Sequence, residues 1–372
     1  MPKHATLSAS SSARWIACPP SVKAGEKYPD VETEYAREGT DAHALCQYKL
    51  EKALGLPAED PTENLTFYNA QMEECADSYV QFVMEKYAKA KESCPDARVL
   101  VEEHLDFSQY VPGGFGTGDC VIVADGTLYI IDYKYGQGVQ VSAERNTQMM
   151  CYALGALEAY DGIYDVSVID MVIYQPRLSS ISEYMISKEE LLVWAENILA
   201  PAAQLALEGK GDFKAGEHCR FCRARADCRA RAEYNLMLAK YDFRLPPELT
   251  DTEVAVILTR IDALVAWAED VKKEATKKAM EGTVYPGFKV VEGRSVRKYT
   301  SEKDVAKAVI EMGYNPYEKK LLGLTEMKKL LGKQFDEVLG RFIYKPPGKP
   351  TLVPDSDRRR PLNSAKKDFG GK

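Results

Sequence analysis

The stretch "GTGDCVIVADGTLYIIDYKYG" (116–136) holds two carboxylates and a lysine at a spacing that would let them act together. Asp125-Gly126 between two apolar runs is typical of a two-residue hairpin turn, which fixes how the flanking strands pair. Continued along both strands, this register predicts Asp119 directly opposite Asp132, with Cβ atoms roughly 4.5–5.5 Å apart. Lys134 follows two residues later on the same face.

Two carboxylates at the end of an apolar face repel each other and are poorly solvated, so structure alone gives little reason for them. A divalent cation shared by Asp119 and Asp132 removes that cost, and hard oxygen ligands suit Mg²⁺ or Mn²⁺. A lysine beside such an ion would position a water molecule or offset the charge that develops on a phosphate. The alternative is a solvent-exposed hairpin end, on which Asp132 and Lys134 form a weak surface pair.

Helical and strand patterns surround this hairpin. Helices are predicted at 33–54, 66–92, 142–160 and 188–208, and strands at 98–107, 116–126, 127–136, 166–176 and 182–187. Strands with helices before and after them indicate an α/β layer arrangement. Further along, a long amphipathic helix is predicted at 250–281, a hairpin at 287–300 and a helix start at Ser301-x-x-Asp304. The domain boundary is expected near residue 240.

Two further motifs flank the hairpin. Gly118-Asp119 and Asp132-Tyr133-Lys134 resemble the two halves of the PD-(D/E)xK nuclease motif. Gly39-Thr-Asp-Ala-His43 is similar to the G-x-x-x-H helix of the RecB-like exonuclease branch, and Gln148-Met-Met-Cys-Tyr152 to its Q-x-x-x-Y helix. Taken singly, such a histidine is more often packed than a ligand, and the glutamine and tyrosine are more often surface and core residues. Their joint occurrence, in this order around the hairpin, favours the resemblance.

The resemblance implies a fold and a reaction. The fold is an α/β restriction-endonuclease-like core, in which a mixed central sheet is flanked by helices. The reaction is cleavage of DNA with one or two Mg²⁺ or Mn²⁺ ions. The implied metal ligands are His43, Asp119, Asp132 and the backbone carbonyl of Tyr133.

The same resemblance assigns roles around the ion. Lys134 would orient the nucleophilic water, and Gln148 and Tyr152 would contact the DNA strand near the cut. Glu102 and Gly39 are expected to support the ligands without touching the ion. The chain has no G-x-x-x-x-G-K-[ST] motif, so ATP is not implied.

Nine cysteines fit poorly with a disulfide framework in a chain of 372 residues. Five are scattered and are interpreted as small core residues: Cys46, Cys75, Cys94, Cys120 and Cys151. Cys219-x-x-Cys222 and Cys228 are clustered, which favours metal, but three ligands leave a Zn²⁺ site or a cubane cluster one short. His218 would complete a zinc site, although adjacent residues such as His218 and Cys219 rarely both reach one tetrahedral ion.

The stretch "LSASSSARWIACPPSV" (7–22) offers another fourth ligand, because Pro19-Pro20 end a short helix directly after Cys18. A serine-rich helix start, an aromatic residue and Cys-Pro resemble the N-terminus of AddB-type nucleases and of the CRISPR-associated exonuclease of the adaptation module. Those relatives carry one cysteine before the nuclease core and three after it. The resemblance implies a [4Fe–4S] cluster, with Zn²⁺ as the alternative. The implied cluster ligands are Cys18, Cys219, Cys222 and Cys228.

Arginines gather around the cysteine cluster, at Arg220, Arg223, Arg225, Arg229 and Arg231. They would offset the negative charge of an iron–sulfur cluster and form a basic ridge for a phosphate backbone, with Arg220 and Arg223 as the expected DNA contacts. A solvated helix face is the alternative. The net charge of −7 argues against a polycation that coats nucleic acid.

The composition, with 45% hydrophobic and 28% charged residues, is that of a globular protein. No apolar run approaches the ~20 residues of a membrane span, and the N-terminus lacks the apolar region of a signal peptide. We therefore expect no membrane association and a cytoplasmic location.

These patterns predict a RecB-like nuclease domain with an iron–sulfur staple at 1–235, a mainly helical accessory module at 240–345 and a disordered tail at 346–372. The expected function is a metal-dependent DNA exonuclease of phage or mobile-element origin, acting in end processing or recombination. Its expected partners are single-stranded DNA or duplex ends, together with phage recombination proteins. The alternatives are a catalytically silent DNA-binding module on a nuclease fold and a zinc-stabilised interaction protein.

Overall fold

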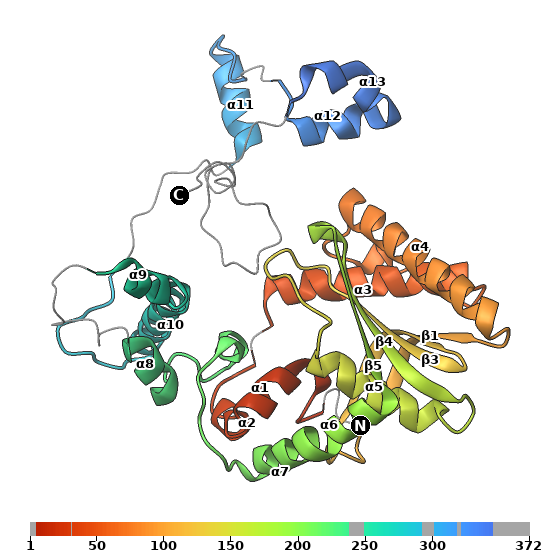
Figure 1. Ribbon diagram of the computed structural model, residues 1–372. Coiled ribbons are helices and arrows are strands. Elements are labelled where there is room, and N and C mark those ends of the chain that lie inside the picture. Colours follow the sequence, from red (N-terminus) through yellow and green to blue (C-terminus); the bar gives the residue numbers. More distant parts are fainter. Residues whose placement is uncertain (1–4, 31, 238–248, 292–300, 318–320, 345–372) are drawn as a thin grey trace, which may run out of the picture. The chain divides into compact units, whose positions relative to one another are not determined.

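The computed structural model describes residues 5–30, 32–237, 249–291, 301–317 and 321–344 (Figure 1). The chain divides into two compact units, Met1–Lys277 and Lys278–Lys372. The division falls inside helix α10 (Ile261–Met280), on which Asp270 pairs with Arg225 and Arg231. The predicted boundary near residue 240 lies outside the described residues. The predicted tail at 346–372 and most of the predicted hairpin at 287–300 lie outside the described residues.

The first unit is built on a five-stranded sheet in which the strands follow their order in the chain. The strands are β1 (Arg98–Asp106), β2 (Phe115–Val123), β3 (Gly126–Tyr133), β4 (Val166–Gln175) and β5 (Ser180–Ser187). Strands β3 and β4 run parallel and the other neighbours run antiparallel. The predicted α/β fold with a mixed sheet is confirmed. A parallel pair needs a crossover connection, and helix α5 (Thr147–Tyr160) supplies it.

Helices α3 (Glu34–Ala53) and α4 (Ala70–Ser93) lie on one side of the sheet (Figure 1). The side chains of Thr33 and Asn69 cap them by accepting hydrogen bonds from N–H groups of the first turn. The ring of Tyr79 on α4 lies 5.0 Å from that of Tyr133 and 5.8 Å from that of Tyr174, centroid to centroid. These aromatic contacts hold the helical layer over the ends of β3 and β4.

Helix α5 is buried on nearly all sides, and its N-cap is Asn146, whose side chain accepts hydrogen bonds in the first turn. A Cβ at Gly155 would lie only 2.9 Å from the backbone of Leu105, so glycine lets the helix approach β1 closely. The outer side of α5 is covered by the N-terminal segment, where Ser12 and Thr147 share a hydrogen bond of 2.6 Å between their hydroxyls. This close packing fixes the residues of the first turn of α5 against the sheet.

The N-terminal segment contains α1 (Ser12–Ala17) and α2 (Ser21–Gly25), separated by Pro19-Pro20 as predicted. The predicted helix at 188–208 is an almost continuous run of α6 (Lys188–Trp194), a π-helical turn (Ala195–Leu199) and α7 (Ala200–Glu208). The irregular turn precedes Pro201, which has no N–H to donate within the helix. Helices α1 and α2 contact α7, so the N-terminal segment meets the helical run that follows β5.

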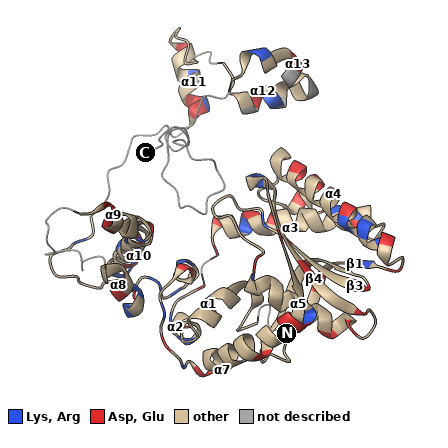
Figure 2. Ribbon diagram, in the orientation of Figure 1, with Lys and Arg blue, Asp and Glu red and all other residues tan. Residues whose placement is uncertain are grey.

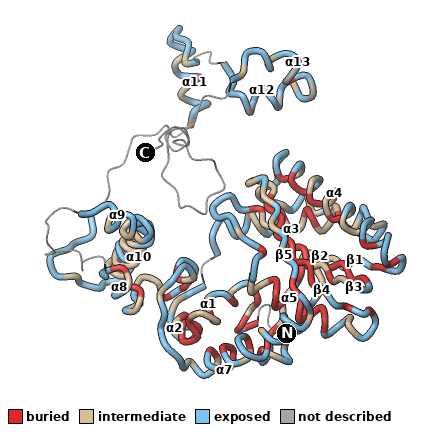
Figure 3. Tube along the Cα trace, in the orientation of Figure 1, coloured by how far each residue is buried: buried red, intermediate tan, exposed pale blue. Residues whose placement is uncertain are grey.

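The other helices of the first unit are α8 (Arg229–Leu236), α9 (Asp251–Leu258) and α10, so the predicted helix at 250–281 is two helices. In the second unit, α11 (Glu302–Glu311), α12 (Leu324–Leu331) and α13 (Phe335–Leu339) are largely exposed (Figure 3). Ser301 caps α11 by accepting a hydrogen bond from the Asp304 N–H, as predicted. Among the described residues, no helix is both long and apolar enough to cross a membrane.

Candidate active site

The hairpin of β2 and β3 has the register that the sequence predicts. Cys120 lies opposite Ile131, and the pairing continues to the turn, where Gly126 has a φ of +83°. The left-handed conformation at this position is the reason for the glycine. Asp119 and Asp132 lie one residue beyond the last paired position, at the end of the hairpin where the two strands stop pairing.

Asp119 is held from two sides. Its Oδ1 lies 3.1 Å from Nδ1 of His43, which α3 brings over the middle of β2. Its Oδ2 accepts a hydrogen bond of 2.7 Å from the N–H of Tyr133 on the neighbouring strand. The ring of His43 also meets that of Tyr133 edge to face, at 5.5 Å between centroids. The fold therefore brings together His43 and Asp119, which the resemblance implies as ligands of one ion, while their role as ligands stays a prediction.

Glu102, which was expected to support the metal ligands without touching the ion, lies among the possible ligands themselves. The possible ligand atoms of His43, Glu102 and Asp119 all lie within 4.8 Å of one another. Glu102 has a φ of +51°, and it interrupts the pairing of β1 with β2 at the position opposite Asp119. A non-glycine residue in this region is strained, and such strain is often found where a side chain is re-aimed into a site.

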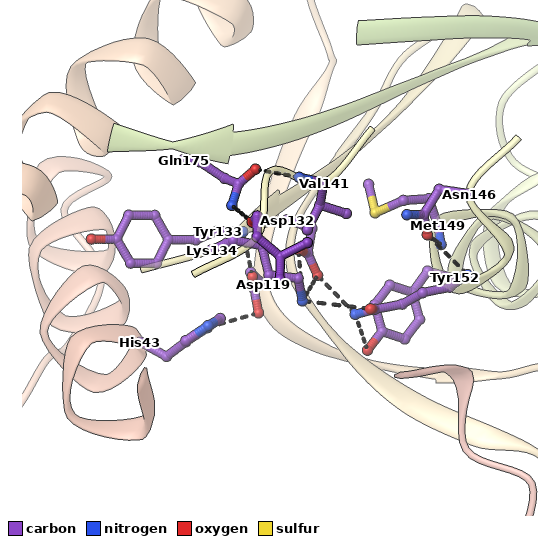
Figure 4. Close-up of polar contacts among 12 residues, drawn as sticks. His43, Asp119, Asp132, Tyr133, Lys134, Val141, Asn146, Met149, Tyr152 and Gln175 are labelled. Atoms are coloured by element: carbon purple, nitrogen blue, oxygen red, sulfur yellow. Dashed lines mark hydrogen bonds and ion pairs between the residues drawn. The ribbon is translucent and has the colours of Figure 1, made fainter. Parts of the chain in front are cut away.

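Asp132, Lys134, Gln148 and Tyr152 form a second connected group (Figure 4). Nζ of Lys134 lies 2.9 Å from Oδ2 of Asp132. Gln148 on α5 donates from Nε2 to Oδ1 of Asp132 at 2.9 Å and lies 3.2 Å from the Tyr152 hydroxyl. Helix α3 thus supplies a polar partner for Asp119, and α5 supplies one for Asp132.

Burial and charge set the protonation of the first group. Burial alone would lower the pKa of His43, but the Asp119 carboxylate outweighs it and raises that pKa to about 9. Burial would raise the pKa of Asp119, but His43 outweighs this and holds it below its ordinary value. Burial, aided by the charge of Asp119, raises the pKa of Glu102 to about 7. Near neutral pH the free site therefore holds protons that a cation would have to displace.

The second group is tuned in the same way. Burial raises the pKa of Asp132, although Lys134 opposes the shift. Burial would lower the pKa of Lys134, but Asp132 and Asp119 raise it, so the lysine stays charged. Three carboxylates therefore meet one lysine and one histidine in a half-buried space. A divalent cation would relieve the repulsion among the carboxylates, and one imidazole with carboxylate oxygens is a ligand set that suits Mn²⁺ or Mg²⁺.

The remaining predicted residues of the catalytic group are Tyr133, Gly39 and Tyr152. The N–H of Tyr133 is used by Asp119, whereas its carbonyl as a ligand stays a prediction. Gly39 lies on α3 one turn before His43, and a Cβ there would meet no heavy atom within 4 Å. Tyr152 is only 7% exposed, and a Cβ at Gly116 would lie 2.6 Å from its ring. Tyr152 thus packs against Gly116 of β2 and accepts a hydrogen bond from Gln148, and its contact with DNA stays a prediction.

The four cysteines predicted to hold a cluster line one cavity. Cys18 at the end of α1, Cys219 in the 3₁₀ turn Glu217–Phe221, Cys222 and Cys228 face it together. Cys18, Cys219 and Cys222 are buried and Cys228 is half-buried. The N–H of Gly216 donates to Sγ of Cys219 at 3.4 Å. The fold thus brings Cys18 from the N-terminal segment to the three cysteines that follow α7, as the resemblance implies.

The spacing of these thiols bears on which metal they fit. Among the described residues, the groups of three possible ligands within 4.8 Å of one another are His43–Glu102–Asp119 and Cys94–Asp96–Asp125, and the four-cysteine set is neither. A tetrahedral zinc ion with Zn–S bonds of ~2.3 Å needs sulfurs about 3.8 Å apart. An iron–sulfur cubane holds its cysteines farther apart, because each binds a different iron. The four thiols line one cavity without forming such a group of three.

The arginines near the cysteines are largely engaged within the protein. Arg223 pairs with Asp30, and Arg225 and Arg231 both pair with Asp270 on α10. Arg231 is 6% exposed, so it cannot present its charge to a DNA backbone. Arg220 is exposed and lies over the ring of Phe221, and blue segments mark the stretch beside α8 in Figure 2. Of the five arginines in the predicted basic ridge, only those that are exposed therefore remain candidates for binding a phosphate backbone.

Replacing Glu102 by glycine is expected to stabilise the metal-free protein by about 1–2 kcal/mol while weakening Mn²⁺ binding. Glycine adopts the φ of +51° without strain, and the change removes a carboxylate that Asp119 repels. Glu102→Gln removes the charge but keeps the strain, so its gain should be smaller. Urea unfolding and Mn²⁺ titration of the three proteins measure both effects. A Glu102→Gly protein that unfolds at lower urea than the wild type contradicts this account.

A family model described as "Protein of unknown function (DUF2800)" matches residues 4–360 of the chain. Among solved structures, the chain is similar to one titled "Crystal structure of SSO0001", with 16% sequence identity and a TM-score of 0.22. That likeness covers 50% of this chain and 95% of the other. A TM-score this low supports no conclusion about fold or function.

Proposed function

The chain belongs to the DUF2800 family, and we propose that it is a divalent-metal-dependent deoxyribonuclease with a PD-(D/E)xK core. The observation that carries the proposal is the meeting of His43, Glu102 and Asp119 within 4.8 Å, beside the Asp132–Lys134 pair. A solvated surface hairpin would not bury Asp132, which is 2% exposed, or draw a histidine from another helix onto Asp119. Buried, mutually perturbed titratable groups of this kind are typical of active sites.

Each residue has a role in the proposed reaction. His43, Glu102, Asp119 and Asp132 would hold Mg²⁺ or Mn²⁺. A bound ion of this type lowers the pKa of its water and offsets charge on a phosphate. Lys134, kept charged by Asp132, would orient the nucleophilic water and stabilise the charge on the phosphate being cleaved.

Residues around these groups fix their geometry. Gln148 holds Asp132 through Oδ1 and is itself held by the Tyr152 hydroxyl. The Tyr133 N–H holds Asp119 through Oδ2, which leaves Oδ1 facing His43. Such fixed carboxylates lose little freedom when an ion binds, which favours tight and specific coordination.

We further propose that Cys18, Cys219, Cys222 and Cys228 hold a [4Fe–4S] cluster. The cavity that these four thiols share supports this assignment, and Zn²⁺ is the alternative. Arg14 lies close enough to Cys222 and Cys18 for their charges to act on its pKa, although burial has the larger effect and lowers it. A buried guanidinium at this place would offset the negative charge of bound thiolates.

The test of the proposed function is cleavage of end-labelled single-stranded and duplex DNA with Mn²⁺ by anaerobically purified protein. We expect products that shorten from an end, and no products when EDTA is present. Intact DNA with demonstrably bound Mn²⁺ would leave a DNA-binding module and overturn the enzyme assignment. A colourless protein with stoichiometric zinc would overturn the iron–sulfur assignment and favour a zinc-stabilised interaction protein.

Binding of Mn²⁺ is expected to release protons and to tighten as the pH rises. His43, with a pKa of about 9, and Glu102, with a pKa of about 7, must both lose protons to become ligands. Affinity should rise about tenfold per pH unit between pH ~7 and ~9, where His43 alone titrates, and more steeply below pH ~7. Calorimetry in buffers of different ionisation enthalpy counts the protons. Binding without proton release at pH ~8 contradicts the ligand set.

A further inference from the structure

The segment that joins β3 to α5 is fixed at both ends. The Lys134 N–H donates to the Tyr174 carbonyl at 2.9 Å. Gln175, which is 2% exposed, accepts from the Val141 N–H at 2.7 Å and donates to the Val139 carbonyl at 3.0 Å (Figure 4). A buried glutamine used in this way acts as a short piece of strand pairing. Between these two fixed points, residues 136–138 are exposed.

The two glycines of this exposed part have no evident role within the chain. Neither Gly136 nor Gly138 has a φ in the left-handed region. A Cβ at either position would meet no heavy atom within 4 Å, in contrast to Gly155 and Gly116, which are closely packed. Glycine raises the entropic cost of ordering a segment, so its use here needs another reason. Close approach of a molecule outside the chain to this backbone would supply such a reason.

The surroundings of residues 136–138 favour an anion. Their three N–H groups donate no hydrogen bond to any residue that the structure describes. Lys134 precedes them, and the guanidinium of Arg177 lies 4.5 Å from the centroid of the Tyr135 ring. Arg177 is paired with Glu38 through Nη1, but its buried Nε has no hydrogen-bond partner among the described residues. Exposed N–H groups that follow a lysine in the chain are suited to phosphate oxygens.

We propose that Gly136-Gln137-Gly138 binds a phosphate of the backbone of single-stranded DNA, next to the phosphate held at Asp132 and Lys134. The identity of the strand rests on the proposed nuclease function. The position follows from the chain, because Gly136 lies two residues after Lys134 on a segment that Gln175 fixes in place. Because glycine has no side chain, the DNA backbone can lie directly on the peptide groups of this segment. Such a contact does not depend on the base sequence.

The test compares the wild type with the double variant Gly136→Ala/Gly138→Ala in binding a labelled single-stranded oligonucleotide in EDTA. Hydrogen bonds to charged groups suggest that the variant will bind about tenfold more weakly. A series of oligonucleotides, each with one uncharged methylphosphonate linkage, locates the contact. For the wild type, one linkage should weaken binding about tenfold when neutralised, and for the double variant neutralising the same linkage should have little effect.

Gly162→Ala is the matched control, because Gly162 is also exposed, has an ordinary φ and would place its Cβ in open space. It should bind DNA as the wild type does. All the proteins should keep the wild-type melting temperature, and a drop confined to the double variant would overturn the proposal in favour of a structural role. Equal affinity of the double variant and the wild type would also overturn it. Because binding is measured without metal, a protein that cuts no DNA but shows the expected linkage effect refutes the nuclease and keeps this contact.

Discussion

Asp132→Asn is expected to lower kcat/KM for DNA cleavage by about a thousandfold, because the metal and the carboxylates that hold it supply several kcal/mol to such reactions. Asparagine keeps the shape of the side chain and a hydrogen-bonding oxygen for Gln148. It removes a charge that burial disfavours, and it also weakens the pair with Lys134. These two effects oppose each other, so the free energy of unfolding should change by less than about 1 kcal/mol.

The matched control is Asp170→Asn. Asp170 is also 2% exposed and lies on the neighbouring strand β4, where it accepts from Nζ of Lys86 at 3.0 Å. No predicted metal ligand contacts it in the described structure. This variant should lose about 1–3 kcal/mol of stability and keep its cleavage activity. Urea unfolding and initial cleavage rates on one end-labelled substrate separate the two. Equal losses of activity in both variants would mean that Asp132 has only a structural role.

Local signals in the sequence were sufficient for much of the site. Asp125-Gly126 determines a two-residue turn, and turn geometry alone sets the register that brings Asp119 and Asp132 to the end of the hairpin. The helical spacing of Gly39 and His43 placed the histidine on α3, but its contact with Asp119 depends on how α3 lies over the sheet. The order of the motifs in the family that the chain resembles indicated that His43 and Asp119 lie close together. Hydrophobic periodicity alone does not indicate this.

The parts that the sequence did not predict depend on tertiary contacts. Glu102 enters the site through a positive φ, a conformation that glutamate has no intrinsic preference for and that only the surrounding fold imposes. The resemblance implies that Tyr152 contacts DNA. The residue lies on the apolar stripe of its helix, however, and burial of that stripe places its ring inside the protein. Arg225 and Arg231 were read as part of a basic ridge, but both pair with Asp270, distant in the sequence.

Cys18→Ala is expected to remove the iron and the brown colour and to destabilise the protein, although Cys18 lies far along the chain from the Asp132–Lys134 pair. Cys18 lines the cavity with Cys219, Cys222 and Cys228, and Pro19-Pro20 fix where its helix ends. A cluster bound by Cys18 and by Cys219, Cys222 and Cys228 would close a very long loop. By analogy with a covalent cross-link, such closure restricts the unfolded chain by about 5 kcal/mol. Iron analysis, visible absorption and urea unfolding measure the three losses.

Cys94→Ala is the control for this change, because Cys94 is also buried and contacts a carboxylate, Asp96, but lies at the other end of β1 and β2. It should keep its iron and lose only the small stability that a truncated core cysteine costs. Full iron content in Cys18→Ala would show that three cysteines and another ligand suffice, and the staple would then be wrong. Loss of iron in both variants would show that the cluster responds to general destabilisation rather than to the loss of a ligand. Only the selective loss in Cys18→Ala assigns the thiol beside Pro19-Pro20 to the cluster.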